Sequence, residues 1–312
     1  HLKLKMGVTK EGRITAAHAH LAYEAGAYPG SPVGAGAQCV FAAYNIPNVL
    51  IDGYDVLVNK TKSAAYRAPG ATQAAMATET VIDELAEEIG FDSIELRLKN
   101  AAKEGTRRPD GVVFPRIGCV EVLEAMKEHP HYKAPLTGPN RGRGVAIGYW
   151  MNGANQSSVN ISIHSDGTIN LIEGSPDIGG SRASISMQAA EVLGISAEDV
   201  HPAVVDTDSI GSTGGTGGSS VTFKAGWAAH EAAHDVKRQM IERAAMIWGV
   251  SKDSVELNDG VFKTELDQKL TMTFKELASQ LDETGGPIMG RGTVNPSGAG
   301  GAYAGNIVDV EV

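Results

Sequence analysis

The chain has 312 residues, of which 42% are hydrophobic and 21% are charged, a balance that suits one large or two ordinary globular domains. Its formal net charge of −10 argues against a nucleic-acid partner, which needs clustered Lys and Arg, and no apolar run reaches the roughly 18 residues of a membrane span. Because its only cysteines are Cys39 and Cys119 and no Cys-x-x-Cys occurs, the chain cannot carry a disulfide framework, an iron–sulfur cluster or a closed zinc site by itself.

The first hundred residues contain both strand-like and helix-like patterns. Alternation of apolar and polar residues predicts strands, and apolar residues three and four positions apart predict helices. The expected elements are a hairpin of strands at 2–8 and 13–23, a strand pair at 47–59 broken at Asp52-Gly53, a helix at 71–89 ending at Gly90, and a short helix capped by Asp92 or Ser93. The two chain ends, at 1–6 and 307–312, read as the middle of strands, so we expect a fragment or one part of a split subunit.

Residues 132–143, rich in Pro, Gly and Arg, are typical of a linker, and we place a boundary there between domains at 1–135 and 136–312. The elements expected beyond it are strands at 143–150, 157–164 and 168–173, a helix at 182–193, a strand at 201–206, and helices at 221–247 and 273–281. This succession favours an α+β fold in which helices cover mixed or antiparallel sheets.

Two glycine-rich loops, at 174–181 and 211–220, each lie between a strand and a helix. Glycine lets backbone N–H groups approach an anion closely, and the helix that follows adds unpaired N–H groups and the positive end of its dipole. Hydroxyls of Thr216, Ser219 and Ser220 add further donors. We therefore expect a phosphate or another highly polar ligand, with two tight turns that bind nothing as the alternative; neither loop matches a P-loop or a dinucleotide fingerprint.

Three other places carry chemistry in one interpretation and ordinary structure in another. Arg67, in a loop before a helix, presents a guanidinium fork to an anion or pairs with a neighbouring surface acid. Tyr149 and Trp150 end a strand, where they line a ligand pocket or pack in a core. The run 230–234 reads His-Glu-Ala-Ala-His, the pattern of a zinc hydrolase with the Glu as base, but no third ligand is apparent and Ala-rich helices produce this pattern by chance.

The segment Ala65-Tyr66-Arg67-Ala68-Pro69-Gly70-Ala71-Thr72-Gln73, continuing through Glu79 and 83–86 to 95–100, resembles a signature of molybdenum hydroxylase large subunits, the family of xanthine dehydrogenase and aldehyde oxidase. Upstream, 24–28 is similar to a Gly-Ala-Tyr segment of that family. Downstream, 174–181 and 213–226 resemble two segments that wrap molybdopterin. The resemblance covers essentially the whole chain, and it implies two molybdopterin-binding domains: the C-terminal part of the first at 1–135, and the second, truncated at its C-terminus, at 136–312.

The resemblance also implies roles for individual residues. Cofactor-binding residues are expected at Tyr66, Arg67, Ala68, Gln73, Gly179, Gly180, Thr216, Gly217, Gly218 and Ser219. Substrate-lining residues are expected at Pro69, Tyr149 and Trp150. Many relatives have Gly-Gln-Gly where this sequence has Gly179-Gly180-Ser181, which leaves one side-chain hydrogen bond to the cofactor without a matching residue.

The implied activity is hydroxylation of an aldehyde or an N-heterocyclic or aromatic substrate, with oxygen derived from water. The molybdenum of this family is held by its pterin rather than by protein side chains, so no metal ligand is expected in the chain. The general-base Glu lies C-terminal to everything present here, so no catalytic residue is expected either. The expected partners are the rest of the molybdenum subunit, an iron–sulfur subunit and an FAD subunit, and the expected location is cytoplasmic.

Two alternatives remain open at this point. One is a zinc hydrolase built on His230, Glu231 and His234. The other is a non-catalytic binding or assembly protein with the same fold.

Overall fold

A computed structural model of the chain describes residues 1–206, 208–297 and 300–312. The chain forms two compact units, His1–Met151 together with Gly300–Val312, and Asn152–Ala299. Each unit contains one mixed sheet, with parallel and antiparallel strand pairs, and one antiparallel sheet. Helices pack on these sheets, so the expected α+β class with mixed sheets is confirmed. In these described ranges no helix is long and apolar enough to cross a membrane.

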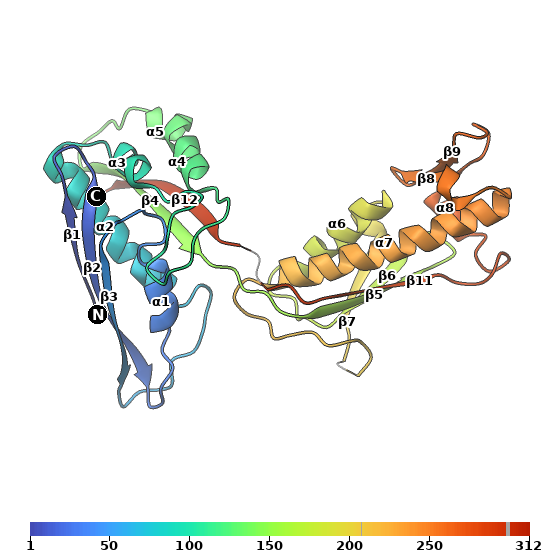
Figure 1. Cartoon of the computed structure of the whole chain (residues 1–312), viewed down its shortest axis with the longest axis horizontal. Coiled ribbons are helices and arrows are strands. Elements are labelled where there is room, and N and C mark those ends of the chain that lie inside the picture. Colours follow the sequence, from blue (N-terminus) through green and yellow to red (C-terminus); the bar gives the residue numbers. More distant parts are fainter. Residues whose placement is uncertain (207, 298–299) are drawn as a thin grey trace. The chain divides into compact units, whose positions relative to one another are not determined.

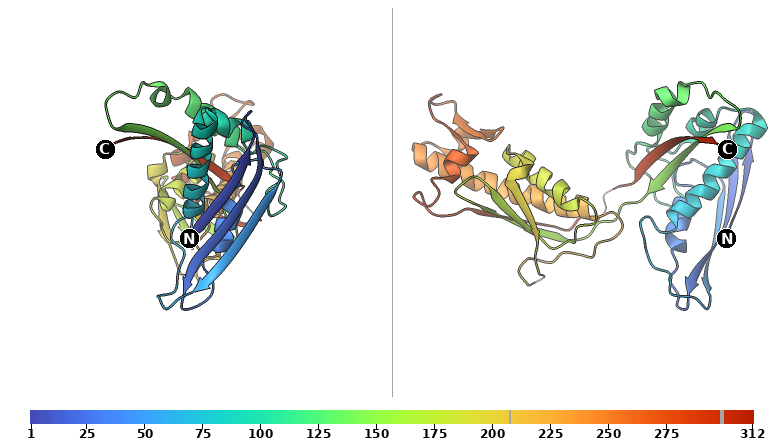
Figure 2. Two further views of the ribbon diagram at one scale, coloured as in Figure 1. Left: turned by 90° about the vertical axis from the view of Figure 1, so that its left-hand side faces the viewer. Right: turned by 180° about the vertical axis from the view of Figure 1, so that it is seen from behind.

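The first unit contains a three-stranded sheet, a two-stranded sheet and five helices (Figures 1 and 2). Its strands are β1 (Leu2–Val8), β2 (Ile14–Gly26), β3 (Val49–Leu57), β4 (Arg141–Trp150) and β12 (Ala302–Glu311). Its helices are α1 (Val33–Cys39), α2 (Ala71–Ile89), α3 (Ser93–Asn100), α4 (Cys119–Glu128) and α5 (Pro130–Lys133). The apolar face of α2 packs with Leu21 of β2 and Ile147 of β4 in one buried core, so this long helix joins the two sheets.

The predicted hairpin and the helix at 71–89 are confirmed. Helix α2 ends because Gly90 adopts the left-handed conformation (φ 69°), which a side chain disfavours. Helix α3 begins because the Asp92 carboxylate accepts hydrogen bonds from the N–H groups of Ile94 and Glu95.

The strand pair expected at 47–59 is wrong. Residues Val49–Leu57 form one strand, β3, which pairs in parallel with β2, and Gly53 lies opposite Leu21 without any break. A Cβ at Gly53 would lie 3.0 Å from Cγ2 of Val33, so this glycine makes room for α1 rather than a turn.

The second unit is a four-stranded sheet, in the order β11-β5-β6-β7, with α6 and α7 on one face and a three-stranded antiparallel sheet beside them (Figure 1). Its helices are α6 (Ser181–Leu193), α7 (Val221–Trp248) and α8 (Phe274–Ala278), with 3₁₀ turns at Ala197–Asp199 and Lys252–Ser254. Its strands are β5 (Ser157–Ile163), β6 (Ile169–Glu173), β7 (Val200–Val204), β8 (Val255–Asn258), β9 (Val261–Thr264), β10 (Thr271–Thr273) and β11 (Met289–Val294).

The predicted elements from 143 to 247 lie within two residues of the observed ones. The helix expected at 273–281 ends earlier, at Ala278, although Thr273 and Glu276 form the capping box that starts it. Strands β8, β9, β10 and β11 were not predicted, although Asp259-Gly260 between β8 and β9 is a hairpin signal.

The segment expected to be a linker, 132–143, contains the end of α5 and the start of β4. Both elements belong to the first compact unit, because β4 pairs along its length with β12 from the end of the chain. The boundary between two cofactor-binding domains at 135/136 stays a prediction.

Candidate cofactor-binding site

The loop before α2 holds its residues in an unusual backbone conformation. Arg67 and Ala68 have φ angles of 33° and 48°, in the left-handed region that non-glycine residues rarely adopt. Gly70 (φ 82°) lies so close to Pro32 that a Cβ would meet the Pro32 carbonyl oxygen at 2.3 Å, and its own carbonyl accepts a 2.8 Å hydrogen bond from the Tyr23 hydroxyl. Strained backbone held by its surroundings is common at functional sites.

This loop presents its side chains to solvent. Tyr66, Arg67 and Gln73 are exposed, and Pro69 is half-buried. The exposed guanidinium of Arg67 suits an anionic ligand, because its planar fork of donors matches carboxylate and phosphate groups.

Ala68 leads from the loop into a small apolar cluster that also contains Tyr149 and Trp150. Tyr149 is buried, its hydroxyl accepts a 2.6 Å hydrogen bond from Nη1 of Arg108, and its ring lies 5.2 Å from that of Tyr303. Burial raises the pKa of Tyr149 and is the largest effect on it. The neighbouring Arg108 lowers this pKa by a smaller amount, so it stays above its ordinary value. The structure therefore brings together three predicted site residues from distant parts of the sequence.

In the second unit, a carboxylate of the loop 174–181 binds backbone N–H groups of the same loop. Oδ1 of Asp177 accepts hydrogen bonds from the N–H groups of Gly179, Gly180 and Ser181 at 2.9–3.0 Å. Burial raises the pKa of Asp177, but these donors outweigh it and the pKa lies below its ordinary value. The N–H groups of Gly179, Gly180 and Ser181 are thus already paired, so what Gly179 and Gly180 offer a ligand is close approach rather than free donors.

A buried lysine, Lys224, binds the loop 211–220, and the sequence analysis did not predict this role. Lys224 is fully buried, and its ammonium donates to Oδ1 of Asn155 (2.6 Å) and to the carbonyls of Gly214 and Gly215. Burial lowers the pKa of Lys224, although Glu173 opposes this effect. Its position within the apolar stripe of α7 was the available signal, since a lysine there needs polar partners.

Four predicted cofactor residues, Thr216, Gly217, Gly218 and Ser219, occupy the exposed end of this loop. Ser219 has a left-handed φ of 61°, and the carbonyl of Gly218 accepts a 2.5 Å hydrogen bond from the N–H of Gly153. The loop end is therefore fixed although exposed.

The two glycine-rich loops touch each other. A Cβ on Gly174 would lie 2.9 Å from Oγ1 of Thr213, so the first loop leaves room for the second. In these two loops and in the first turn of α6, several buried polar atoms have no hydrogen-bond partner within the described ranges: Oγ of Ser175, Nε of Arg182, Oγ1 of Thr213 and Oγ of Ser220. Because buried polar groups are nearly always paired, such a concentration fits a polar, anionic ligand.

The run His230, Glu231 and His234 lies on α7. The two Nε2 atoms are 3.3 Å apart, and Glu231 accepts a 3.1 Å hydrogen bond from Nε1 of Trp227. Among residues 1–206, 208–297 and 300–312, no group of three or more His, Cys, Asp or Glu side chains could hold a metal ion. The zinc-hydrolase alternative therefore lacks its third ligand.

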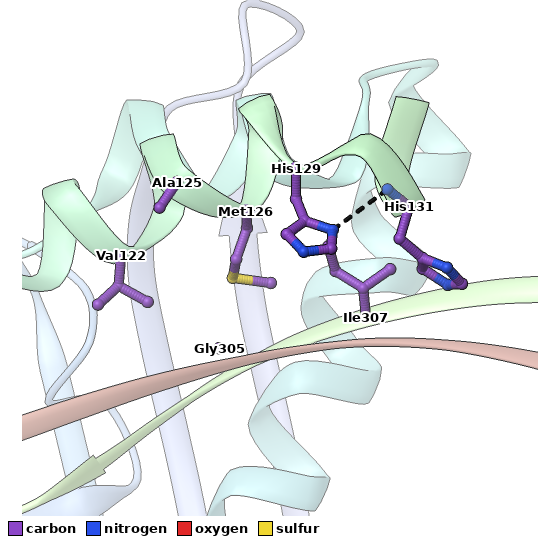
Figure 3. A pocket seen from close by; sticks show the side chains of 7 residues that line it. All are labelled: Val122, Ala125, Met126, His129, His131, Gly305 and Ile307. Atoms are coloured by element: carbon purple, nitrogen blue, oxygen red, sulfur yellow. Dashed lines mark hydrogen bonds between the residues drawn. The ribbon is translucent and has the colours of Figure 1, made fainter. Parts of the chain in front are cut away.

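An apolar pocket lies elsewhere in the first unit, between α4 and β12 (Figure 3). Met126 points toward Gly305, where a Cβ would lie 2.1 Å from its sulfur. The pocket is lined by Val122, Ala125, Met126, His129, His131, Gly305 and Ile307. It contains none of the predicted site residues.

Two family models match the chain, at residues 1–101 and 121–312, and both are described as a molybdopterin cofactor-binding domain. The chain belongs to the molybdopterin cofactor-binding domain family. The second match alone covers more than half of the chain, so the resemblance to the xanthine dehydrogenase and aldehyde oxidase large subunits is confirmed, as are the two cofactor-binding domains.

Relatives of this molybdopterin-binding chain are longer than it is. The nicotine 6-hydroxylase large subunit of Paenarthrobacter nicotinovorans is 27% identical over 290 residues, which are 82% of this chain and 35% of that protein. A putative xanthine dehydrogenase molybdenum-binding subunit of Escherichia coli K12 is 27% identical over 99% of this chain and 44% of its own length. The chain thus spans between a third and a half of these relatives.

The fold of the molybdopterin-binding chain is also found in a solved structure. Quinoline 2-oxidoreductase from Pseudomonas putida 86 superposes with a TM-score of 0.79, covering 99% of this chain and 44% of that one, at 20% identity. At this identity the likeness concerns the fold alone.

Replacing Thr213 by valine tests whether the unpaired hydroxyls serve the cofactor. We expect the cofactor-free chain to keep its stability or to gain up to about 1 kcal/mol, because an unpaired buried hydroxyl is removed at nearly constant volume. We expect the assembled protein to contain less molybdopterin, measured as pterin and molybdenum per chain. Ser186→Ala is the matched control, since Ser186 is also buried and unpaired but lies within α6; equal cofactor loss in both variants would contradict the assignment.

Proposed function

We propose that the chain is the molybdenum-cofactor-binding part of an oxidoreductase that hydroxylates an aldehyde or an N-heterocyclic or aromatic substrate with oxygen from water. The observation that carries this proposal is the contact between the loops 174–181 and 211–220, with unpaired buried polar atoms in both loops, in a chain matched by cofactor-binding domains. The names of the relatives refer to nicotine, xanthine and quinoline, which favours an N-heterocycle as substrate.

In this proposal the side chains of this protein bind and orient, and the bound cofactor supplies the two-electron redox chemistry. Ser175, Thr213 and Ser220 pair their free hydroxyls with the polar groups of the cofactor, and Gly179 and Gly180 let it approach the backbone. Thr216, Gly217, Gly218 and Ser219 form the rest of that cradle.

For the first unit, taken by itself, we propose Tyr66, Arg67, Ala68 and Gln73 as cofactor-binding residues. The left-handed backbone at Arg67 and Ala68 supports this role, because sparsely populated backbone conformations cluster at ligand-binding sites. Pro69, Tyr149 and Trp150 are the proposed substrate-lining residues of this unit. Trp150 supports the proposal through its buried indole N–H, which has no partner within the part of the chain that the structure describes.

The remaining components of the proposal lie outside this chain. The general-base Glu belongs to the rest of the molybdenum subunit, and electrons leave through iron–sulfur and FAD partners. The coverage of 35 to 44% of the relatives is consistent with such additional segments.

Metal analysis of the native assembly tests the proposal. We expect about one molybdenum per chain, several irons from partner subunits, and incorporation of ¹⁸O from labelled water into a hydroxylated N-heterocycle. A native assembly that contains no molybdenum and no pterin, whatever its zinc content, would contradict the proposal. Molybdenum with pterin but no turnover of any aldehyde or N-heterocycle would favour the non-catalytic binding or assembly protein.

A further inference from the structure

Helix α7 carries an exposed histidine pair that the cofactor-binding role does not use. His230 and His234 are four residues apart and therefore lie on the same face of the helix, one turn from each other. Their rings are 4.4 Å apart between centroids, and their Nε2 atoms face each other at 3.3 Å.

That separation matches a metal site. Zinc binds histidine nitrogens at about 2.0–2.1 Å with tetrahedral angles, which places two ligand nitrogens about 3.3 Å apart. The pair therefore needs no change in the spacing of its nitrogens, only a tautomer in which both Nε2 atoms carry a lone pair.

A neighbouring carboxylate favours that tautomer. Oε1 of Glu231 lies 3.5 Å from Nδ1 of His230 and is itself held by the indole of Trp227. A carboxylate beside the other ring nitrogen orients a histidine ligand and increases its basicity.

The next acid on the helix is already paired. Asp235 accepts hydrogen bonds from Nη2 of Arg238 (2.6 Å), from Gln239 and from the N–H of Arg291 on β11. Water would therefore complete the coordination shell, in agreement with the lack of a three-residue metal cluster among the described residues.

We propose that His230 and His234 bind one divalent transition-metal ion of the zinc, nickel and copper class. The site is separate from the proposed cofactor cradle, because His230 follows Ser220 by ten residues of helix, a rise of about 15 Å. It does not depend on molybdopterin, so the proposed function and this site stand or fall separately.

Calorimetric titration of the 312-residue chain with Zn²⁺, without added cofactor, tests the site. We expect one saturable site with micromolar affinity, and His230→Ala or His234→Ala should each weaken it at least tenfold. Cu²⁺ should bind more tightly than Zn²⁺, and Mg²⁺ should not compete, because imidazole prefers the later transition metals.

The double variant His129→Ala with His131→Ala is the matched control, since these two residues are also close in sequence and lie beside a pocket. It should keep the wild-type affinity. The free energies of unfolding of His230→Ala and His234→Ala should lie within about 0.5 kcal/mol of that of the wild type, because both histidine side chains are exposed and alanine favours helix. Unchanged zinc affinity in His230→Ala and His234→Ala, or its loss in the control, would overturn the proposal.

Discussion

Replacing Arg97 by methionine is expected to lower the free energy of unfolding by about 3–5 kcal/mol, because it leaves the buried carboxylate of Glu79 without its cation. The Arg97 side chain is fully buried and donates to Glu79 (2.9 Å), to Asp83 (2.8 Å) and to the carbonyl of Val145 on β4 (3.0 Å). Burial, the largest cause, lowers the pKa of Arg97, but Tyr44, Glu79 and Asp83 together raise it above its ordinary value, so the guanidinium stays charged.

Urea unfolding of the chain measures this effect, and Arg141→Met is its control. Arg141 pairs with Glu311 at 2.6 Å, but both side chains are exposed, so its loss should cost less than about 1 kcal/mol. The double variant Arg97→Met with Glu79→Gln should recover part of the stability, because one unpaired charge is removed with the arginine. If Arg97→Met were no more destabilising than Arg141→Met, the buried pair of Arg97 with Glu79 would not stabilise the fold as we infer.

Replacing Gly292 by alanine should destabilise the second unit by about 3 kcal/mol, near the upper end of the usual effect of overpacking. Gly292 of β11 faces α7 so closely that a Cβ would lie 2.1 Å from the carbonyl oxygen of Ala228 and 2.7 Å from the N–H nitrogen of Ala232. Both contacts are backbone atoms of α7, so neither can move away alone, and the whole helix would have to shift from the sheet.

Gly144→Ala provides the control for this variant. Gly144 also lies in a strand, β4, but a Cβ there would meet nothing within 4 Å, so the change should stay within about 0.5 kcal/mol. The measurement is the unfolding midpoint of each variant in denaturant. Equal midpoints for Gly292→Ala and Gly144→Ala would show that α7 does not pack on β11 at this distance.

Sequence patterns predicted the helices and strands that are determined by their own residues and caps. Helices α2 and α7 have a regular apolar stripe and glycines at their C-terminal ends, and both were placed within one residue. Strand β3 was misread because Gly53 serves a contact with Val33, which no local pattern reveals. The burial of Arg97 was equally invisible, since an arginine in an amphipathic helix is ordinarily exposed.

The candidate site shows the same division. The two glycine-rich loops and the loop that contains Arg67 were recognisable in the sequence, because glycine and proline mark turns and loops by their own backbone preferences. The contact between Gly174 and Thr213, and the support of the second loop by Lys224, depend on residues brought together by folding. The pairing of the Gly179 and Gly180 amides with Asp177 also altered what the first loop can offer a ligand.

The pairing of β4 with β12 has a consequence for biosynthesis. Trp150 lies opposite Ala302, so two adjacent strands of one sheet are separated by the whole sequence of the second unit. During translation β4 leaves the ribosome long before its partner exists, and the first unit must wait with an unpaired strand edge while the second unit is made. Pairing the two strands closes a long loop, and this lowers the conformational entropy of the chain. The entropic cost is smaller if the inserted unit has already folded, so early folding of that unit favours pairing of β4 with β12.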